Sequence, residues 1–80
     1  MLSRKVYVRV VSETDEWGKI SPISVMWEDG RSYIVDKVLD VRRACAPKVG
    51  GTAMRYTVKI EGKQTYIFFE DGKWFVESKV

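Results

Sequence analysis

Positively charged side chains gather in one segment of this 80-residue chain, residues 37–59. This basic segment holds a single carboxylate, Asp40, so its formal charge is +5, and because the whole chain is only +3, the remainder is −2. Its cations are Lys37, Arg42, Arg43, Lys48, Arg55 and Lys59. Charge concentrated in this way favours binding to an anionic partner, although Lys and Arg also serve as solvated strand edges.

Aromatic residues accompany these cations. Tyr56 follows Arg55 directly, and Tyr66 and Phe68 belong to the next strand that the pattern predicts. Small β-barrels bind single-stranded nucleic acid with cations along the phosphates and aromatic rings stacked on the bases. The expected partner is therefore single-stranded nucleic acid or another anionic macromolecule, bound by Arg42, Arg43, Lys48, Arg55, Lys59 and Tyr56. In the alternative interpretation the aromatic residues form the core and the cations are only a solvated face.

Arg42 and Arg43 begin the segment 42–52, which has the composition of a loop. Pro47 removes a backbone donor and restricts the residue before it, and Gly50 and Gly51 allow wide backbone freedom. A mobile cationic loop suits a binding site. A connection without a function is the open alternative.

Residue types needed for catalysis or metal binding are scarce. The chain has no histidine, so the commonest general base and a usual zinc ligand are missing. Cys45 is the single cysteine, which excludes an internal disulfide, and it has no imidazole to activate it. Asp29 and Asp71 precede glycines in turn sequences, which explains them without catalysis. We therefore expect a protein that is not an enzyme, with no catalytic residue, metal site or cofactor.

The elements that must position the basic segment are strands joined by tight turns. Glu-Asp-Gly followed by a cation occurs at 28–31 and again at 70–73, and both copies lie between strand-forming residues, as in β-hairpins. Pro22 lacks an amide hydrogen, so it should lie at the start of a strand, on an edge or at a bulge. Alternation of apolar and polar residues predicts strands over 5–11, 19–28, 32–41, 53–61, 63–70 and 73–77.

Residues 36–46 fit two patterns. Val35, Val38, Leu39 and Arg42 also have helical spacing, and Asp36 could cap a short helix. The β-branched content and the preceding hairpin favour a strand to about residue 41, with the short helix as the alternative.

Six short strands cannot leave both faces of a flat sheet in water. We therefore expect an all-β fold, a small antiparallel six-stranded barrel or roll built from consecutive hairpins, as one domain over residues 1–80. The expected interior consists of Val6, Val8, Val25, Trp27, Val35, Leu39, Tyr56, Val58, Ile67, Phe69, Trp74 and Val76.

The segment 63–70 is apolar on both faces of its predicted strand. Such a strand is central, lies under a cover, or is exposed for a partner. In the last case Tyr66, Phe68 and Phe75 form an exposed aromatic face. A protein-interaction module that uses this face, including a homodimer, is the alternative to nucleic-acid binding.

No stretch of the sequence approaches the roughly 20 apolar residues of a membrane span, and the first residues run directly into a strand pattern without an apolar signal core. We expect a cytoplasmic protein without a membrane partner. The order EDGRSYIVDKVLDVRRA, a Gly-rich loop, RYTV and YIFFEDGKWFVE resembles small uncharacterised bacterial proteins of unknown function, loosely over residues 5–77. This resemblance implies a compact bacterial cytosolic domain and carries no site residue.

Overall fold

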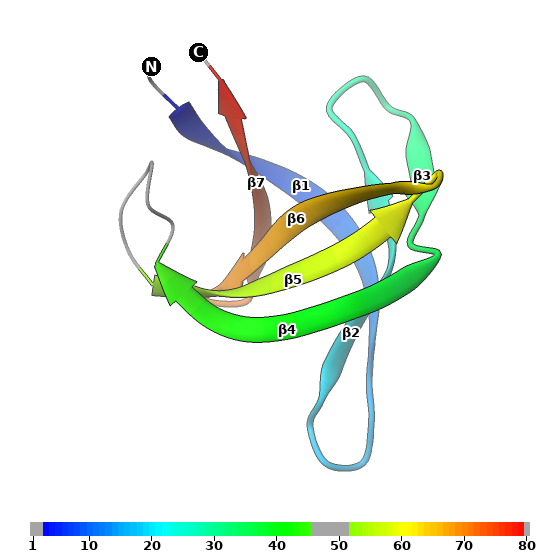
Figure 1. The fold of residues 1–80 in the computed structure, drawn as a ribbon, viewed down its shortest axis with the longest axis vertical. Coiled ribbons are helices and arrows are strands. Elements are labelled where there is room, and N and C mark those ends of the chain that lie inside the picture. The colour runs from blue at the N-terminus through cyan, green and yellow to red at the C-terminus, as the bar shows by residue number, and fades with distance from the viewer. Residues whose placement is uncertain (1–2, 46–51, 80) are drawn as a thin grey trace.

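The computed structural model describes residues 3–45 and 52–79, which form strands and turns without a helix (Figure 1). Among these residues there is accordingly no helix that could span a membrane. The all-β fold class is confirmed, and a helix over residues 37–45 is excluded because these residues form a strand. The strands are β1 (Ser3–Thr14), β2 (Ile20–Met26), β3 (Ser32–Ile34), β4 (Lys37–Cys45), β5 (Thr52–Ile60), β6 (Lys63–Glu70) and β7 (Lys73–Lys79).

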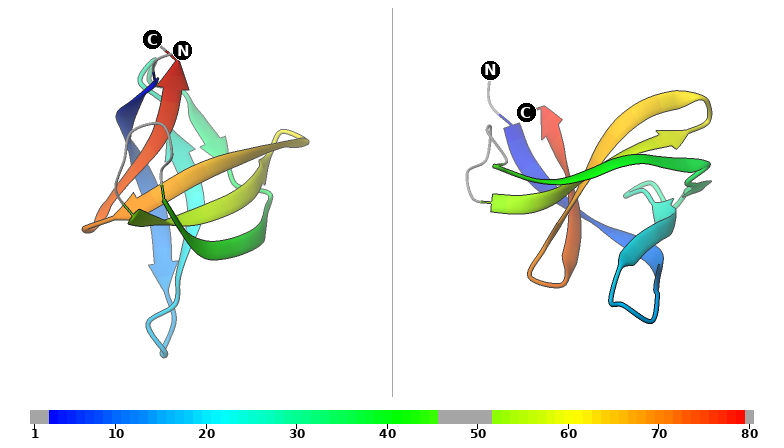
Figure 2. Two further views of the ribbon diagram at one scale, coloured as in Figure 1. Left: turned by 60° about the vertical axis from the view of Figure 1, so that its left-hand side comes forward. Right: turned by 60° about the horizontal axis from the view of Figure 1, so that its bottom comes forward.

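All these strands belong to one antiparallel sheet, in the order β3-β2-β1-β7-β6-β5-β4. The two edge strands, β3 and β4, are consecutive in the chain, with only Val35 and Asp36 between them. The two edges must therefore come close together at this point, and the sheet curls into a half-barrel (Figure 1, Figure 2). The expected small barrel or roll of consecutive hairpins is confirmed in this form.

The strand expected over 32–41 is two strands, because the chain changes its partner within it. The amide of Val35 donates to the carbonyl of Ile23 next to β3, at 2.8 Å. The amide of Asp36 donates instead to the carbonyl of Lys59 on β5, also at 2.8 Å. The expected count of six strands is corrected to seven for this reason.

The long strand β1 also changes its partner. Residues 3–8 pair with β7 and residues 9–14 pair with β2. The register between β1 and β2 shifts between Val11 and Ser12, and Pro22 stands opposite Ser12. A residue without an amide hydrogen is tolerated at such an irregularity, so the position expected for Pro22 is confirmed.

Two-residue turns at 61–62 and 71–72 connect the last three strands. Glu61 and Asp71 have φ angles of 51° and 52°, and the glycine after each has a φ of 75°. Positive φ at both central residues gives the type I′ turn, whose twist matches that of the flanking strands. Asp71 is thus a turn residue, as expected. Asp29 also stabilises its own turn, because its carboxylate accepts a hydrogen bond from the amide of Arg31 at 2.9 Å.

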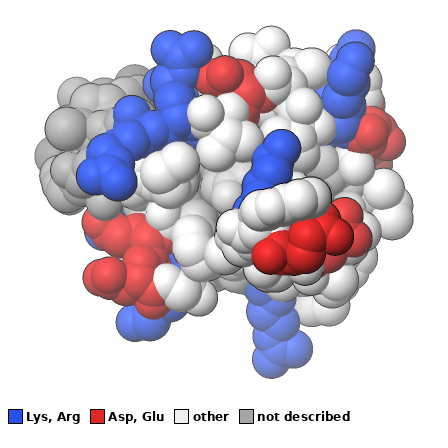
Figure 3. Space-filling view, turned by 90° about the horizontal axis from the view of Figure 1, so that it is seen from below, with Lys and Arg blue, Asp and Glu red and all other residues white. Residues whose placement is uncertain are grey.

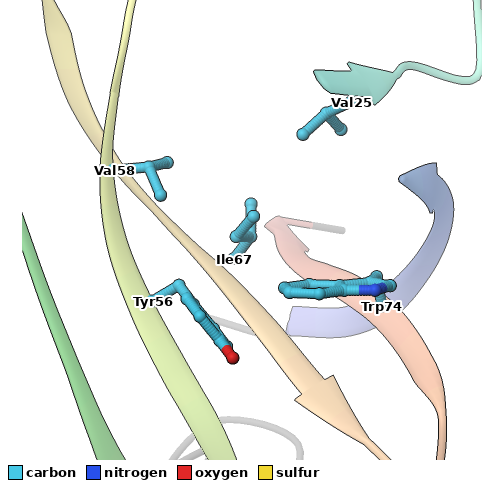
Figure 4. Close-up of a cluster of buried hydrophobic side chains, with 5 residues drawn as sticks. All are labelled: Val25, Tyr56, Val58, Ile67 and Trp74. Atoms are coloured by element: carbon cyan, nitrogen blue, oxygen red, sulfur yellow. The ribbon is translucent and has the colours of Figure 1, made fainter. Parts of the chain in front are cut away.

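The main core lies on the inner, concave face of the sheet. Val25 of β2 and Val58 of β5, which are far apart in the strand order, both belong to it, so this core stabilises the curl. The buried side chains that pack together there are Val25, Tyr56, Val58, Ile67 and Trp74 (Figure 4).

One residue expected in the interior is not there. Leu39 is 44% exposed, because the register between β4 and β5 shifts between Val38 and Asp40 and leaves Leu39 without a partner. The other residues expected inside are buried or pack against the core.

A second apolar cluster lies on the outer face and contains Ala53, Phe68 and Phe75. Successive residues of a strand point to opposite faces, so Ile67 enters the inner core and Phe68 the outer cluster. The rings of Phe68 and Phe75 stack with their centres 5.1 Å apart. The strand β6 is therefore buried on both faces at Ile67 and Phe68, between β5 and β7, which explains the apolar sequence there.

Candidate nucleic-acid interface

Cations, one carboxylate and one exposed aromatic ring share the outer face of β4, β5 and β6, and the carboxylate, Asp40, stands opposite Thr57. The register sets Arg42 opposite Arg55 and Lys37 opposite Lys59, and Tyr66 stands opposite Thr57, in the row between them. Residues 55, 57 and 59 alternate along β5, so all three rows lie on the same face. We call this set the outer strip: Lys37, Arg42, Arg55, Lys59 and Tyr66.

The centre of the outer strip is a contact between Arg55 and Tyr66. The Cζ atom of Arg55 lies 4.7 Å from the ring centre of Tyr66, within cation–π distance, and Tyr66 remains 45% exposed. The Nε atom of Arg55 is buried and has no hydrogen-bond partner. A ligand cannot reach this buried atom, so the attraction of an anion such as a phosphate to Arg55 depends on the charge of its guanidinium as a whole.

The strands β4 to β6 keep a positive surplus after their ion pairs are considered. Their carboxylates are Asp40 and Glu70, which pair with Arg42 at 2.6 Å and with Lys5 of β1 at 2.8 Å. The guanidinium of Arg42 is charged at neutral pH in any case, and the hydrogen bond to Asp40 raises its pKa further. Among the described residues, Arg42 is the only cation of the outer strip in an ion pair.

This surplus is a local property of the molecule. On the face seen from below, Lys and Arg side chains are interspersed with Asp and Glu (Figure 3). Charges of opposite sign that alternate in this way give a weak field at a distance, so this face as a whole attracts an anionic partner only weakly.

The arginine pair expected at the site is divided between the two faces. Arg42, Arg55 and Lys59 lie together on the outer strip. Arg43 stands opposite Met54, whose side chain packs against the inner core, so Arg43 belongs to the other face. A single ligand on the outer strip would therefore contact Arg42 and not Arg43.

The loop expected over 42–52 begins later than predicted, because residues 42–45 are part of β4. Arg42 and Arg43 are thus strand residues, held in a fixed register. Lys48, the remaining cation expected at the site, lies outside the described residues.

Tyr56 is a core residue, so its expected role in stacking on a base is corrected. It is only 5% exposed, its hydroxyl donates to the carbonyl of Ile20 at 2.8 Å, and its ring centre lies 5.0 Å from that of Trp74. Burial also raises the pKa of the Tyr56 phenol.

Tyr66 is the exposed ring, and the sequence contains a signal that identifies it. A two-residue turn at 61–62 sets Ile60 opposite Lys63, and counting away from the turn sets Tyr66 opposite Thr57. Thr57 shares its face with Arg55, whereas Tyr56, the immediate neighbour of Arg55, must point the other way.

The aromatic face expected for a protein partner is mostly covered. Phe68 and Phe75 are 3% and 0% exposed, so the expectation that both are exposed is wrong, and of the expected three only Tyr66 reaches the surface. The Nζ atom of Lys5 lies 4.8 Å from the ring centre of Phe75, and the ring of Tyr7 meets Phe75 edge-on at 5.9 Å. A homodimer through these three aromatic residues therefore has little apolar surface to bury.

No protein-family model, curated protein or solved structure matches this chain. The resemblance to small bacterial proteins stays an expectation. Within the described ranges, no group of His, Cys, Asp and Glu side chains is arranged to hold a metal ion.

Proposed function

We propose that this protein is a non-enzymatic, cytoplasmic binding module for single-stranded nucleic acid and that the outer strip is its contact surface. The proposal rests on the contact between Arg55 and Tyr66, where a half-exposed ring lies beside a guanidinium that forms no ion pair among the described residues. Phosphates would bind the cations of the strip while a base stacks on Tyr66. Paired bases in a duplex hide their faces, so an exposed ring favours a single strand.

The dimensions of the outer strip suit a short stretch of nucleotides. Neighbouring strands lie about 4.8 Å apart and four residues along a strand span about 13 Å, so the strip measures about 10 Å by 13 Å. Contacts to phosphates make affinity depend on salt, by about 0.7 log unit per log unit of salt for each phosphate bound on a single strand.

Charge reversal at two neighbouring residues on opposite faces tests this proposal. Arg42→Glu places a carboxylate in the outer strip, and Arg43→Glu makes the same change of charge on the other face. In fluorescence anisotropy titrations with labelled random single-stranded RNA and DNA at low salt, we expect Arg42→Glu to weaken binding by about tenfold or more, and Arg43→Glu to weaken it far less. A third variant, Tyr66→Ala, should lose about 1–3 kcal/mol of stacking energy.

Circular dichroism spectra of the variants establish that each is folded before its affinity is compared. Equal affinities of the two arginine variants would overturn the assignment of the outer strip. Absence of salt-sensitive binding by the unaltered protein would overturn the proposed function itself.

A further inference from the structure

A groove on the outer face, away from the outer strip, lies where β1 changes its partner. It has a volume of about 830 Å³ and runs between the middle of β1, the neighbouring part of β2 and the turn that leads into β7. Three of its apolar residues are exposed: Tyr7 by 57%, Val11 by 60% and Met26 by 39%. Ser24 and Ser32 complete the floor with small side chains, which leave the apolar surface open.

The backbone along one side of this groove offers an unpaired strand edge. Val8 is the last residue of β1 that pairs with β7, where it stands opposite Trp74. From Arg9 onwards β1 pairs with β2 on its other side. On the side where residues 3–8 pair with β7, no described strand lies beside the rest of β1. Figure 1 shows the β1–β2 hairpin extending past the end of the other strands. Such an edge is a template for an additional strand.

The charges beside the groove have one sign. Arg9 and Lys73 are the only charged residues in its lining, and neither forms an ion pair among the described residues. The Nζ atom of Lys73 lies 5.8 Å from the ring centre of Tyr7, so this cation stands directly over the apolar floor. A ligand that carries a carboxylate next to an apolar group is complementary to this arrangement.

We propose that this groove docks an extended segment of another protein, which adds a strand to β1 over residues 10–14. The part of the segment that pairs with β1 would cover Val11. Its continuation past Val10 would lie on the outer face, with apolar side chains against Tyr7 and Met26 and a carboxylate between Arg9 and Lys73. Backbone hydrogen bonds to a free edge supply affinity, and the pockets for alternate side chains supply selectivity. This site is separate from the outer strip and does not depend on nucleic-acid binding.

A second copy of the chain fits the groove less well. Trp74 lies opposite Val8, and Lys73 is the next residue of β7 in the direction of Arg9. The β1 strands of two copies could therefore pair with each other only over residues 10–14. Antiparallel pairing about the middle of this stretch, Ser12, would set Val11 against Glu13 of the other copy. In that register the exposed side chain of Val11 gains no apolar partner, so a second copy would leave the apolar surface of the groove uncovered.

The probe for this proposal is a phage-displayed library of random peptides of about ten residues, which is the upper end of the usual range of strand lengths. We expect enrichment of peptides in which apolar residues alternate and at least one Asp or Glu is present. An enriched peptide, made synthetically and labelled, should bind Arg9→Glu and Val11→Glu at least about tenfold more weakly than the unaltered protein. The matched control is Arg42→Glu, which reverses one charge on the outer strip and should bind the peptide normally.

Two-dimensional NMR of the unaltered protein locates the site independently of any variant. We expect the enriched peptide to shift the amide signals of residues 9–13 and 72–74. The proposal fails if no peptide is enriched, if the enriched peptides lack acidic residues, or if the shifted amides lie elsewhere. It also fails if analytical ultracentrifugation shows a dimer that Val11→Glu dissociates, because the occupant would then be a second copy.

Discussion

Tyr56 and Tyr66 are chemically identical residues on neighbouring strands, and the face on which each lies determines its role. Tyr56 points inward, where its ring packs against Trp74 and its hydroxyl satisfies the carbonyl of Ile20. Tyr66 points outward, where the guanidinium of Arg55 lies over a ring that is still half exposed. The first tyrosine therefore contributes to stability, and the second is available to a ligand.

The buried phenol of Tyr56 makes stability depend on alkaline pH. Its pKa is raised above the ordinary value of 10.0 by burial, so the folded state holds this proton more tightly than the unfolded state does. The contribution of Tyr56 is complete below about pH 10 and is lost as the pH rises through the folded-state pKa. In urea denaturation at neutral and alkaline pH, we expect the free energy of unfolding to fall more steeply for the unaltered protein than for Tyr56→Phe.

The control for this measurement is Tyr66→Phe, which removes an exposed phenol and should keep the steep decline. Parallel declines of the unaltered protein and Tyr56→Phe would contradict the role assigned to the buried phenol.

At the scale of the elements, β4 has two features with which natural sheets protect an edge strand. It carries charged residues, among them Lys37, Arg42 and Arg43, and its register is interrupted at Leu39. Charges and bulges both prevent pairing with a strand of another molecule. Part of the positive charge of the basic segment thus has a structural reason, which is why the proposed function rests on the contact between Arg55 and Tyr66 and not on the charge alone.

The bulge in β4 allows a direct test of which face Leu39 occupies. Leu39 is 44% exposed, whereas Ile67 at the centre of the inner core is 0% exposed. We expect Ile67→Ala to lower the free energy of unfolding by about 2–5 kcal/mol and Leu39→Ala to lower it by less than about 1 kcal/mol. Urea denaturation followed by circular dichroism gives both values. If Ile67→Ala does not fold, Ile67→Val should lose about 0.5–1.5 kcal/mol, and a larger loss for Leu39→Ala than for Ile67→Val would place Leu39 in the core.

At the scale of the whole molecule, the curl depends on the short connection between the two edge strands. The backbone amide of Asp36 donates to the carbonyl of Lys59, and its carboxylate accepts a hydrogen bond from the amide of Glu61 at 3.0 Å. Asp36, which lies next to the edge strand β3, is thereby hydrogen-bonded to β5 and to the turn after it, near the opposite edge of the sheet. Packing of Val25 against the same inner core as Val58 stabilises the curl from within.

Loss of the Asp36 carboxylate should weaken this connection. We expect Asp36→Ala to lower the free energy of unfolding by about 1 kcal/mol, and Asp36→Asn, which keeps an acceptor, to lower it by less. Native-state hydrogen exchange should show faster exchange of the Glu61 amide in Asp36→Ala. Unchanged protection of that amide would show that the carboxylate does not hold the turn.

Local features of this protein follow from its sequence alone. Alternation placed most of the strands, the Asp-Gly pair placed Asp71 in a turn, and the missing amide hydrogen of Pro22 placed it at an irregularity. These properties depend on a residue and its near neighbours, so they can be predicted without knowledge of distant contacts. The register across the turn at 61–62 is also local, and it is sufficient to place Tyr66 beside Arg55.

The tertiary structure alone decided which residues of the outer face are covered and where the register between two strands breaks. Alternation predicted an interior that includes Tyr56, but it does not show whether the opposite face is open or covered, because that depends on distant strands. Phe68 and Phe75 are therefore covered, and Leu39 is exposed because the register shifts beside it. The change of partner between Val35 and Asp36 has the same origin, because it requires β2 and β5, which are far apart in the sequence, to meet at one point of a curled sheet.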